Sequence, residues 1–202
     1  MKDLIAGYHR FRDTQWPAQR GLFETLADRG QSPRAMVVAC SDSRADPAMI
    51  FGASPGELFT IRNVGSLIPP FQPDAEFHGT SAALEFGVRV LEVRDLVVMG
   101  HAMCGGVRAL LDGPPPAASD FVGRWMDLAA RARDRVLVCE PADLQTACEH
   151  EVVKVSLENL MTFPWIAERV RDRKLVLHGA TFDIRSGILS MLRPDGAFAP
   201  VP

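Results

Sequence analysis

The sequence lacks any apolar run that approaches the roughly 18 residues needed to cross a bilayer, so we expect no transmembrane helix. It also lacks a run of lysine and arginine long enough to track a phosphate backbone, and its formal net charge is only −3. We therefore predict neither a nucleic-acid partner nor a membrane partner. No internal repeat is present, and Pro114–Pro116 is the only low-complexity tract.

Cysteine is scarce, with four residues (Cys40, Cys104, Cys139 and Cys148) in a chain of 202. The N-terminal residues 1–13 are charged and amphipathic throughout, unlike a secretory signal. We therefore expect a cytoplasmic protein, in which thiols stay reduced and a disulfide framework is not needed. Metal binding or catalysis is then the use to test for at least some of these cysteines.

Composition and apolar patterning predict one α/β domain that spans residues 1–202. Hydrophobic residues make up 47% and charged residues 23%, as in an average globular protein, and the length suits a single core. Short apolar runs predict buried strands, and helical segments separate them. The strands are predicted over 35–39, 58–61, 96–99 and 175–177, and the helices over 4–11, 17–27, 80–91, 104–111, 121–161 with a break near 140–141, and from 164. This alternation predicts a three-layer fold with a central, mainly parallel sheet of four to five strands flanked by helices.

Two of the predicted strands end in reactive side chains. Cys40-Ser41-Asp42-Ser43-Arg44 follows the first strand, and His101-Ala102-Met103-Cys104-Gly105-Gly106 follows the third. Ligands of open parallel sheets bind beyond the carboxyl ends of the strands. If these two strands are neighbours, Cys40, His101 and Cys104 converge. Two thiolates and one imidazole suit zinc, and three protein ligands leave a fourth position open, as in catalytic sites.

A structural alternative exists for each of these residues. Cys40, His101 and Cys104 would then be buried thiols and a hydrogen-bonded core histidine, and Asp42 with Arg44 a structural ion pair that braces the strand end. A structural zinc site would need a fourth protein ligand. The candidates for that ligand are His78, His178, Cys139 and Cys148, of which none stands in a comparable pair.

Together these motifs resemble those of the β-class carbonic anhydrases. The resemblance extends to Pro55-Gly56-Glu57-Leu58-Phe59, Arg62-Asn63-Val64, Ser81-Ala82-Ala83-Leu84-Glu85, Glu158-Asn159-Leu160 and His178-Gly179. It implies a zinc lyase (carbonate dehydratase) that reversibly hydrates CO2 to bicarbonate and a proton, by attack of a zinc-bound hydroxide on CO2. It also implies a homodimer or an assembly of dimers, with a helical arm over residues 1–30 that packs on a partner subunit.

The resemblance assigns roles residue by residue. Cys40, His101 and Cys104 would hold one Zn²⁺ per chain, Asp42 would accept a hydrogen bond from the nucleophile, and Arg44 would hold Asp42. The substrate pocket would consist of Gln31, Phe59, Val64, Phe86 and Gly105, partly supplied by the neighbouring subunit. Gln31 matches the plant-like branch, and Val37 stands where the allosteric branch has tryptophan.

Two other functions remain open at this stage. The same zinc site would suit a hydrolase of CO2-like molecules such as carbon disulfide or carbonyl sulfide, and only pocket access and assembly would distinguish it. A non-catalytic, zinc-stabilised binding module is the second alternative. The retention of Asp42 and Arg44 beside an open coordination position argues against such a module.

Overall fold

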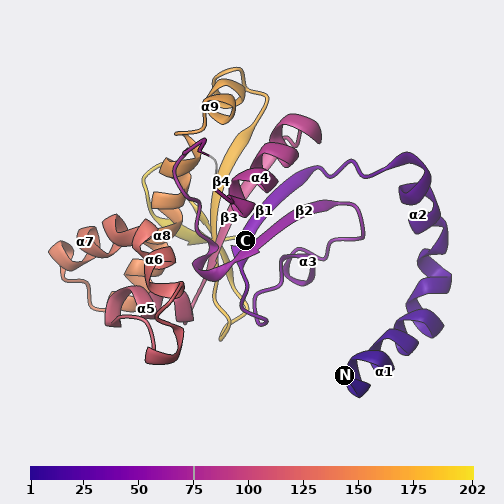
Figure 1. Cartoon of the computed structure of the whole chain (residues 1–202), viewed down its shortest axis with the longest axis horizontal. Helices are drawn as coiled ribbons and strands as arrows, with labels where there is room; N and C mark the ends of the chain where they lie inside the picture. The colour runs from indigo at the N-terminus through magenta and orange to yellow at the C-terminus, as the bar shows by residue number, and fades with distance from the viewer. Residues whose placement is uncertain (75) are drawn as a thin grey trace.

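The computed structural model describes residues 1–74 and 76–202, which form a mixed α/β fold around one six-stranded sheet (Figure 1). The strand order is β2-β1-β3-β4-β5-β6, and the first four of these strands run parallel. The strands are β1 (Ala35–Cys40), β2 (Leu58–Asn63), β3 (Asp95–His101), β4 (Val176–Phe182), β5 (Leu189–Leu192) and β6 (Phe198–Pro200).

Helices precede β1 and connect the parallel strands; most follow the predicted segments, but the short helix over 47–50 was not among the predictions. The helices are α1 (Lys2–Arg10), α2 (Trp16–Arg29), α3 (Pro47–Ile50), α4 (Gly79–Glu85), α5 (Gly105–Asp112), α6 (Val122–Met126), α7 (Ala130–Cys139), α8 (Leu144–Leu160) and α9 (Pro164–Arg171). Wider π-type turns extend α1 over Phe11–Gln15 and α4 over Phe86–Val90, and short 3₁₀ turns cover Val64–Ser66, Pro116–Ala118 and Asp127–Ala129. In the described part of the chain, no helix has the length and apolar character needed to span a membrane.

The sheet carries apolar side chains on both faces, as the uninterrupted apolar runs predict. On one face, Met36 and Val38 of β1 pack with buried residues of α4, α8 and α9. On the other face, Val37 and Ala39 pack near Ile50 of α3 and near β5. The predicted layered α/β arrangement is therefore confirmed.

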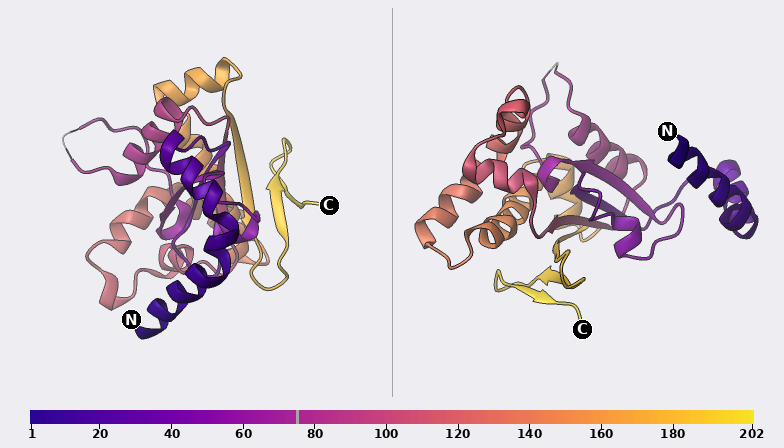
Figure 2. Two further views of the ribbon diagram at one scale, coloured as in Figure 1. Left: turned by 90° about the vertical axis from the view of Figure 1, so that its right-hand side faces the viewer. Right: turned by 90° about the horizontal axis from the view of Figure 1, so that it is seen from below.

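The sheet has six strands, where the sequence predicted four to five. The two extra strands, β5 and β6, pair antiparallel with β4 and with each other at the C-terminal edge. They form the yellow hairpin in Figure 2. A turn over 193–196 connects them, closed by hydrogen bonds from Arg193 N to Ala197 O and from Gly196 N to Arg193 O. Both strands are short and only half-buried, so they lack the apolar run on which the prediction depended.

The N-terminal helices form one arm that projects from the body of the protein (Figures 1 and 2). The sequence predicted two helices here, and the structure joins them through a π-type turn into one continuous but bent helical segment. No residue of this arm is buried, and Leu4, Ile5 and Tyr8 are largely exposed. Near its end, Leu26 packs against Gly56 in the loop before β2. The arm therefore presents an unusual amount of apolar surface for an isolated chain.

Candidate metal centre

Cys40 and His101 lie at the same edge of the sheet because β1 and β3 are adjacent and parallel. Their register pairs Ala39, one residue before Cys40, with Met99, two residues before His101. Cys40 is the last residue of β1, and His101 is the last residue of β3. The neighbouring strands on which the predicted convergence depended are therefore present.

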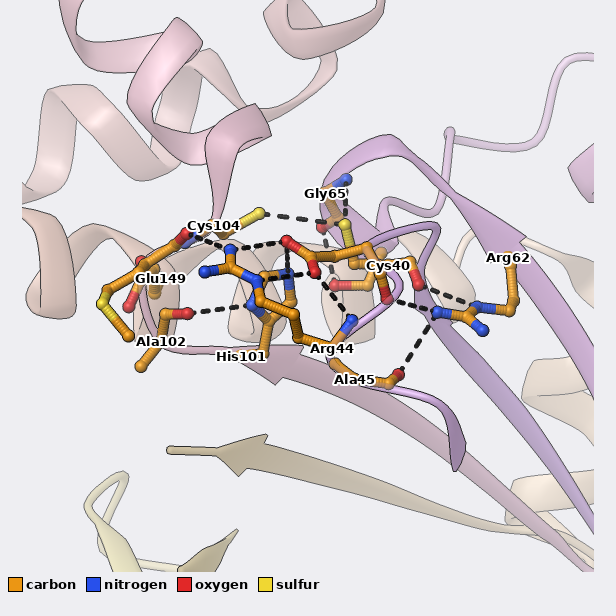
Figure 3. Close-up of polar contacts among 12 residues, drawn as sticks. Cys40, Arg44, Ala45, Arg62, Gly65, His101, Ala102, Cys104 and Glu149 are labelled. Carbon is orange, nitrogen blue, oxygen red and sulfur yellow. Dashed lines mark hydrogen bonds and ion pairs between the residues drawn. The ribbon is translucent and has the colours of Figure 1, made fainter. Parts of the chain in front are cut away.

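Cys104 completes the cluster from the start of α5 (Figure 3). Its sulfur lies 4.0 Å from that of Cys40, and the ligand atoms of Cys40, His101 and Cys104 all lie within 4.8 Å of one another. All three residues are buried. No other group of three or more His, Cys, Asp or Glu residues with potential ligand atoms this close occurs among the described residues. His78 and His178 instead pair with Asp74 and Asp95.

The orientation of the His101 ring suits a metal ligand. Its Nδ1 lies 2.9 Å from the carbonyl oxygen of Ala102, which only accepts hydrogen bonds, so Nδ1 carries the proton. Its Nε2 is then a bare acceptor, and it is buried without a hydrogen-bond partner among the described residues. In metal-binding histidines, the ring nitrogen that does not bind the metal commonly donates to a carbonyl, and this hydrogen bond fixes the tautomer. Two sulfurs and this nitrogen fit zinc.

The two thiols are electrostatically coupled. The hydrogen bond from Cys104 lowers the pKa of Cys40 to about 4, against the effect of burial. The resulting thiolate, together with burial, raises the pKa of Cys104. Burial would lower the pKa of His101, but the Cys40 thiolate and the Ala102 carbonyl outweigh it and raise this pKa. A divalent cation would stabilise both sulfurs as thiolates, because a thiol that coordinates a metal is deprotonated.

A tight loop after β2 closes the cluster from one side. The Gly65 amide lies 3.4 Å from the sulfur of Cys40 and donates a hydrogen bond to it. Gly65 has a φ of +78°, a conformation that glycine adopts without strain. Gly106 in α5 packs so closely that an added Cβ would lie 3.0 Å from Val64 Cγ1. These glycines let the loop backbone approach the sulfurs.

Asp42 and Arg44 stand beside the cluster on the loop that follows β1. Arg44 donates from Nε to Oδ1 and from Nη2 to Oδ2 of Asp42, at 2.9 and 2.8 Å. These hydrogen bonds hold the pKa of Asp42 far below its usual range. Oδ2 of Asp42 also lies 3.9 Å from His101 Nε2. The loop therefore holds an ionised carboxylate oxygen beside the ring nitrogen that His101 contributes to the cluster.

A second carboxylate, that of Glu149, contacts the backbone of the cluster and was not predicted from the sequence. Oε1 of buried Glu149 accepts hydrogen bonds from the Cys104 amide at 2.9 Å and from Gln145 Nε2 at 2.6 Å. Gln145 also donates to the carbonyl of Cys104. Burial raises the pKa of Glu149. A sequence signal exists, because Glu149 shares a helical stripe with Val153, Ser156 and Leu160 and so interrupts a buried face.

Only two of the five residues predicted to line a substrate pocket lie near the cluster within this chain. Val64 and Gly105 lie beside the cluster. Val64 precedes Gly65, which donates to the Cys40 sulfur, and it packs against Gly106, whereas Gly105 directly follows Cys104. Phe59 and Phe86 stack at 5.8 Å, but Phe59 pairs with Met36, near the opposite end of β1 from Cys40. Gln31 is exposed and precedes β1. The length of this strand, about 17 Å, separates it from the Cys40 cluster of the same chain.

Two carbonic anhydrases are similar to the chain over almost its whole length. It is 39% identical to a carbonic anhydrase of Pseudomonas aeruginosa over 201 residues, which is 98% of this chain and 89% of that protein. It is 33% identical to beta carbonic anhydrase 3 of Arabidopsis thaliana over 204 residues, with 98% of this chain and 78% of that protein covered.

Solved structures match the fold as closely. The β-carbonic anhydrase CcaA superposes with a TM-score of 0.93 and 33% identity, over 100% of this chain and 92% of that one. A structure described as one of two tetrameric β-carbonic anhydrases from Sordaria macrospora gives a TM-score of 0.81 and 25% identity, over 98% of both chains.

A family model agrees with these similarities. The model of the carbonic anhydrase family matches residues 35–189, from the first residue of β1 to the first residue of β5. This match spans the strands, the loops and the α5 segment that carry the Cys40, His101 and Cys104 cluster. The chain therefore belongs to the β class of the carbonic anhydrase family, whose members are lyases.

Proposed function

We propose that this protein binds one Zn²⁺ through Cys40, His101 and Cys104 and catalyses the reversible hydration of CO2 to bicarbonate and a proton. The observation that carries the proposal is the buried Nε2 of His101, which has no hydrogen-bond partner among the described residues and lies 3.9 Å from a carboxylate oxygen of Asp42. The ligand atoms of His101, Cys40 and Cys104 all lie within 4.8 Å of one another. When bound at such a site, zinc activates water as a nucleophile near neutral pH.

Asp42 orients the attacking oxygen. Because the pKa of Asp42 is strongly lowered by Arg44, its carboxylate is ionised and only accepts hydrogen bonds. Oδ2 therefore accepts a hydrogen bond from the O–H of the nucleophile, and a lone pair of the nucleophile's oxygen stays directed at CO2. Arg44 keeps this carboxylate in place, and its additional contact with the Met103 carbonyl at 3.3 Å ties the loop after β1 to the loop that follows His101.

An apolar wall next to these polar groups suits CO2, which has no net charge. Val64 stands on the loop that hydrogen-bonds Cys40, with its side chain partly exposed. Gly105 leaves open space where a Cβ would stand. In the proposed enzyme, Phe59 and Phe86 of a partner subunit extend this wall and the partner's Gln31 adds a polar group. Within one chain all three lie away from the cluster: Gln31 precedes β1, Phe59 lies on β2 opposite Met36, and Phe86 stacks on Phe59.

The working form is proposed to be a homodimer or an assembly of dimers, with the arm over residues 1–30 packed on a partner. The exposed apolar residues Leu4, Ile5 and Tyr8 support this proposal, since they would otherwise face water. A related structure from Sordaria macrospora is described as tetrameric. The proposed location is the cytoplasm, where the two thiol ligands would stay reduced.

Stopped-flow CO2 hydration on purified protein, with its zinc content measured, tests the function. Zinc at one per chain together with rapid hydration is the expected result. Zinc without hydration would indicate the non-catalytic binding module instead. Hydrolysis of carbon disulfide or carbonyl sulfide without CO2 hydration would indicate the alternative hydrolase.

A further inference from the structure

Arg62 makes an unusual set of contacts with the loop that carries Cys40 and Asp42. From β2, its Nε donates to the Cys40 carbonyl at 2.9 Å, and its Nη2 donates to the Asp42 carbonyl at 2.5 Å and to the Ala45 carbonyl at 3.4 Å. In Figure 3, Arg62 lies on one side of Cys40 and His101 on the other. One side chain thus gathers three backbone carbonyls of a six-residue turn.

A second charge fixes the direction of the Arg62 guanidinium. Its Nη1 lies 2.7 Å from Oδ2 of Asp46, while Oδ1 of Asp46 accepts from the amides of Ala48 and Met49 and so caps α3. Asp46 is therefore held by a helix on one side and by Arg62 on the other. The Arg62 side chain is only 27% exposed, which limits competition from water.

Only an arginine can make all of these contacts at once. Guanidinium offers five N–H donors in a rigid plane, so donors from different nitrogens reach Asp46, Cys40 and Asp42 together. A lysine ammonium is a single point on a flexible stem and would satisfy only part of the set. Without these hydrogen bonds from Arg62, the peptide groups of the turn would be free to rotate. The Cys40 sulfur and the Asp42 carboxylate would then move with the backbone that carries them.

We infer that Arg62, anchored by Asp46, is a positioning residue that presets the Cys40–Ala45 turn for metal binding and for the orientation of Asp42. Arg62 itself touches neither the sulfurs nor the proposed nucleophile, and it acts through the backbone of the residues that do. The inference rests on the proposed zinc site, and it adds a determinant of that site's geometry.

The test compares Arg62→Lys with wild type by zinc competition against a chelator and by the absorption spectrum of the Co²⁺-substituted protein. Outer residues that orient metal ligands typically contribute about 10–100-fold to metal affinity or activity, so we expect a loss in that range. We also expect altered cobalt bands, because these report thiolate ligation and coordination geometry.

Arg169→Lys is the matched control: Arg169 is 19% exposed and bonds both the side chain and the carbonyl of Glu92, which precedes β3 at the other end of the sheet. It should keep zinc affinity and spectrum within twofold of wild type.

Asp46→Asn keeps the test decisive if Arg62→Lys does not fold. Asparagine retains the Oδ1 that caps α3 and replaces only the oxygen that Arg62 bonds, so we expect a smaller loss in the same direction. Wild-type zinc affinity and cobalt spectra in the folded Arg62 and Asp46 variants would overturn the inference alone. Failure of the wild-type protein to bind zinc would overturn the proposed function, and this inference with it.

Discussion

The guanidinium of Arg44 grips both oxygens of the Asp42 carboxylate, two residues earlier on the same turn. The Arg44 amide adds a third hydrogen bond to Oδ1 at 2.9 Å. Oδ1 is thereby fully occupied, whereas Oδ2 retains accepting capacity on the side of His101 Nε2. The side chain of Asp42 is 17% exposed, so this carboxylate is both ionised and largely sheltered. The pair is therefore built to present one acceptor in one direction.

Asp42→Asn should keep zinc and the fold but lose CO2 hydration by about 10²-fold, the scale of a misplaced reacting group. The amide has nearly the same volume, yet its NH2 group donates where the carboxylate accepts. Stopped-flow rates at equal zinc occupancy are the measurement. Asp95→Asn provides the control, because Asp95 pairs with His178 at the opposite end of β3. Equal rates for wild type and Asp42→Asn would reduce the Asp42–Arg44 pair to a structural brace.

Cys40→Ser should lose most of the bound zinc and nearly all activity, because a hydroxyl is a poorer ligand than a thiolate for this ion. Zinc content by atomic emission, with hydration rates on the same samples, is the measurement. Cys139→Ser should leave both unchanged, since Cys139 is exposed at the end of α7. Near-normal zinc in Cys40→Ser would remove Cys40 from the site.

The convergence of the cluster was predictable because it follows from a general property of parallel sheets. Cys40 and His101 end two apolar runs, and the carboxyl ends of parallel strands meet at one edge. The positions of Gln31 and Phe59 were not predictable in this way, because the resemblance assigns residues to a pocket without saying which subunit supplies them. The strand register then places both away from the chain's own cluster.

The supporting contacts were not predictable from local pattern. Glu149 meets the Cys104 amide across 45 residues of sequence, and Arg62 meets the Cys40 carbonyl across 22. Such contacts depend on how α8 packs on α5 and on how far one side chain extends. Sequence periodicity shows that Glu149 interrupts a buried stripe, but it does not identify the donor that the carboxylate accepts.

Glu149→Ala should reduce the free energy of unfolding by about 1–3 kcal/mol, because it leaves the buried Cys104 amide without an acceptor. Urea unfolding of the zinc-loaded protein is the measurement. Glu149→Gln retains an oxygen that can accept from this amide, so it should lose less. If the alanine and glutamine variants were equally destabilised, lost volume or charge would explain the effect and the hydrogen bond would not.

Asp143 should make stability depend on pH in the acid range. It caps α8, and its pKa is lowered by the Thr146 amide and hydroxyl, which both donate to the carboxylate. Because the folded pKa lies below the unfolded value of 3.8, this stabilisation is complete above 3.8 and disappears as the pH falls through the folded pKa. Asp143→Ala should therefore cost about 0.5–2 kcal/mol at neutral pH and progressively less in acid. Asp143→Asn still caps the Thr146 amide and should show no such dependence; a wild-type minus alanine difference that is constant down to low pH would contradict the assignment.

Mixing two inactive variants tests whether each pocket is shared between subunits. Gln31→Ala impairs a partner's pocket in the proposed dimer, whereas Asp42→Asn impairs the chain's own site. A mixed dimer then contains one site with both defects and one site with neither. Random pairing makes half of the dimers mixed, so co-expression should restore about a quarter of wild-type hydration, well above either variant alone. If Gln31 instead served its own chain, every site in the mixture would carry one defect and hydration would stay at the level of the parents. The structure favours the first outcome, because β1 separates Gln31 from Cys40 along its whole length.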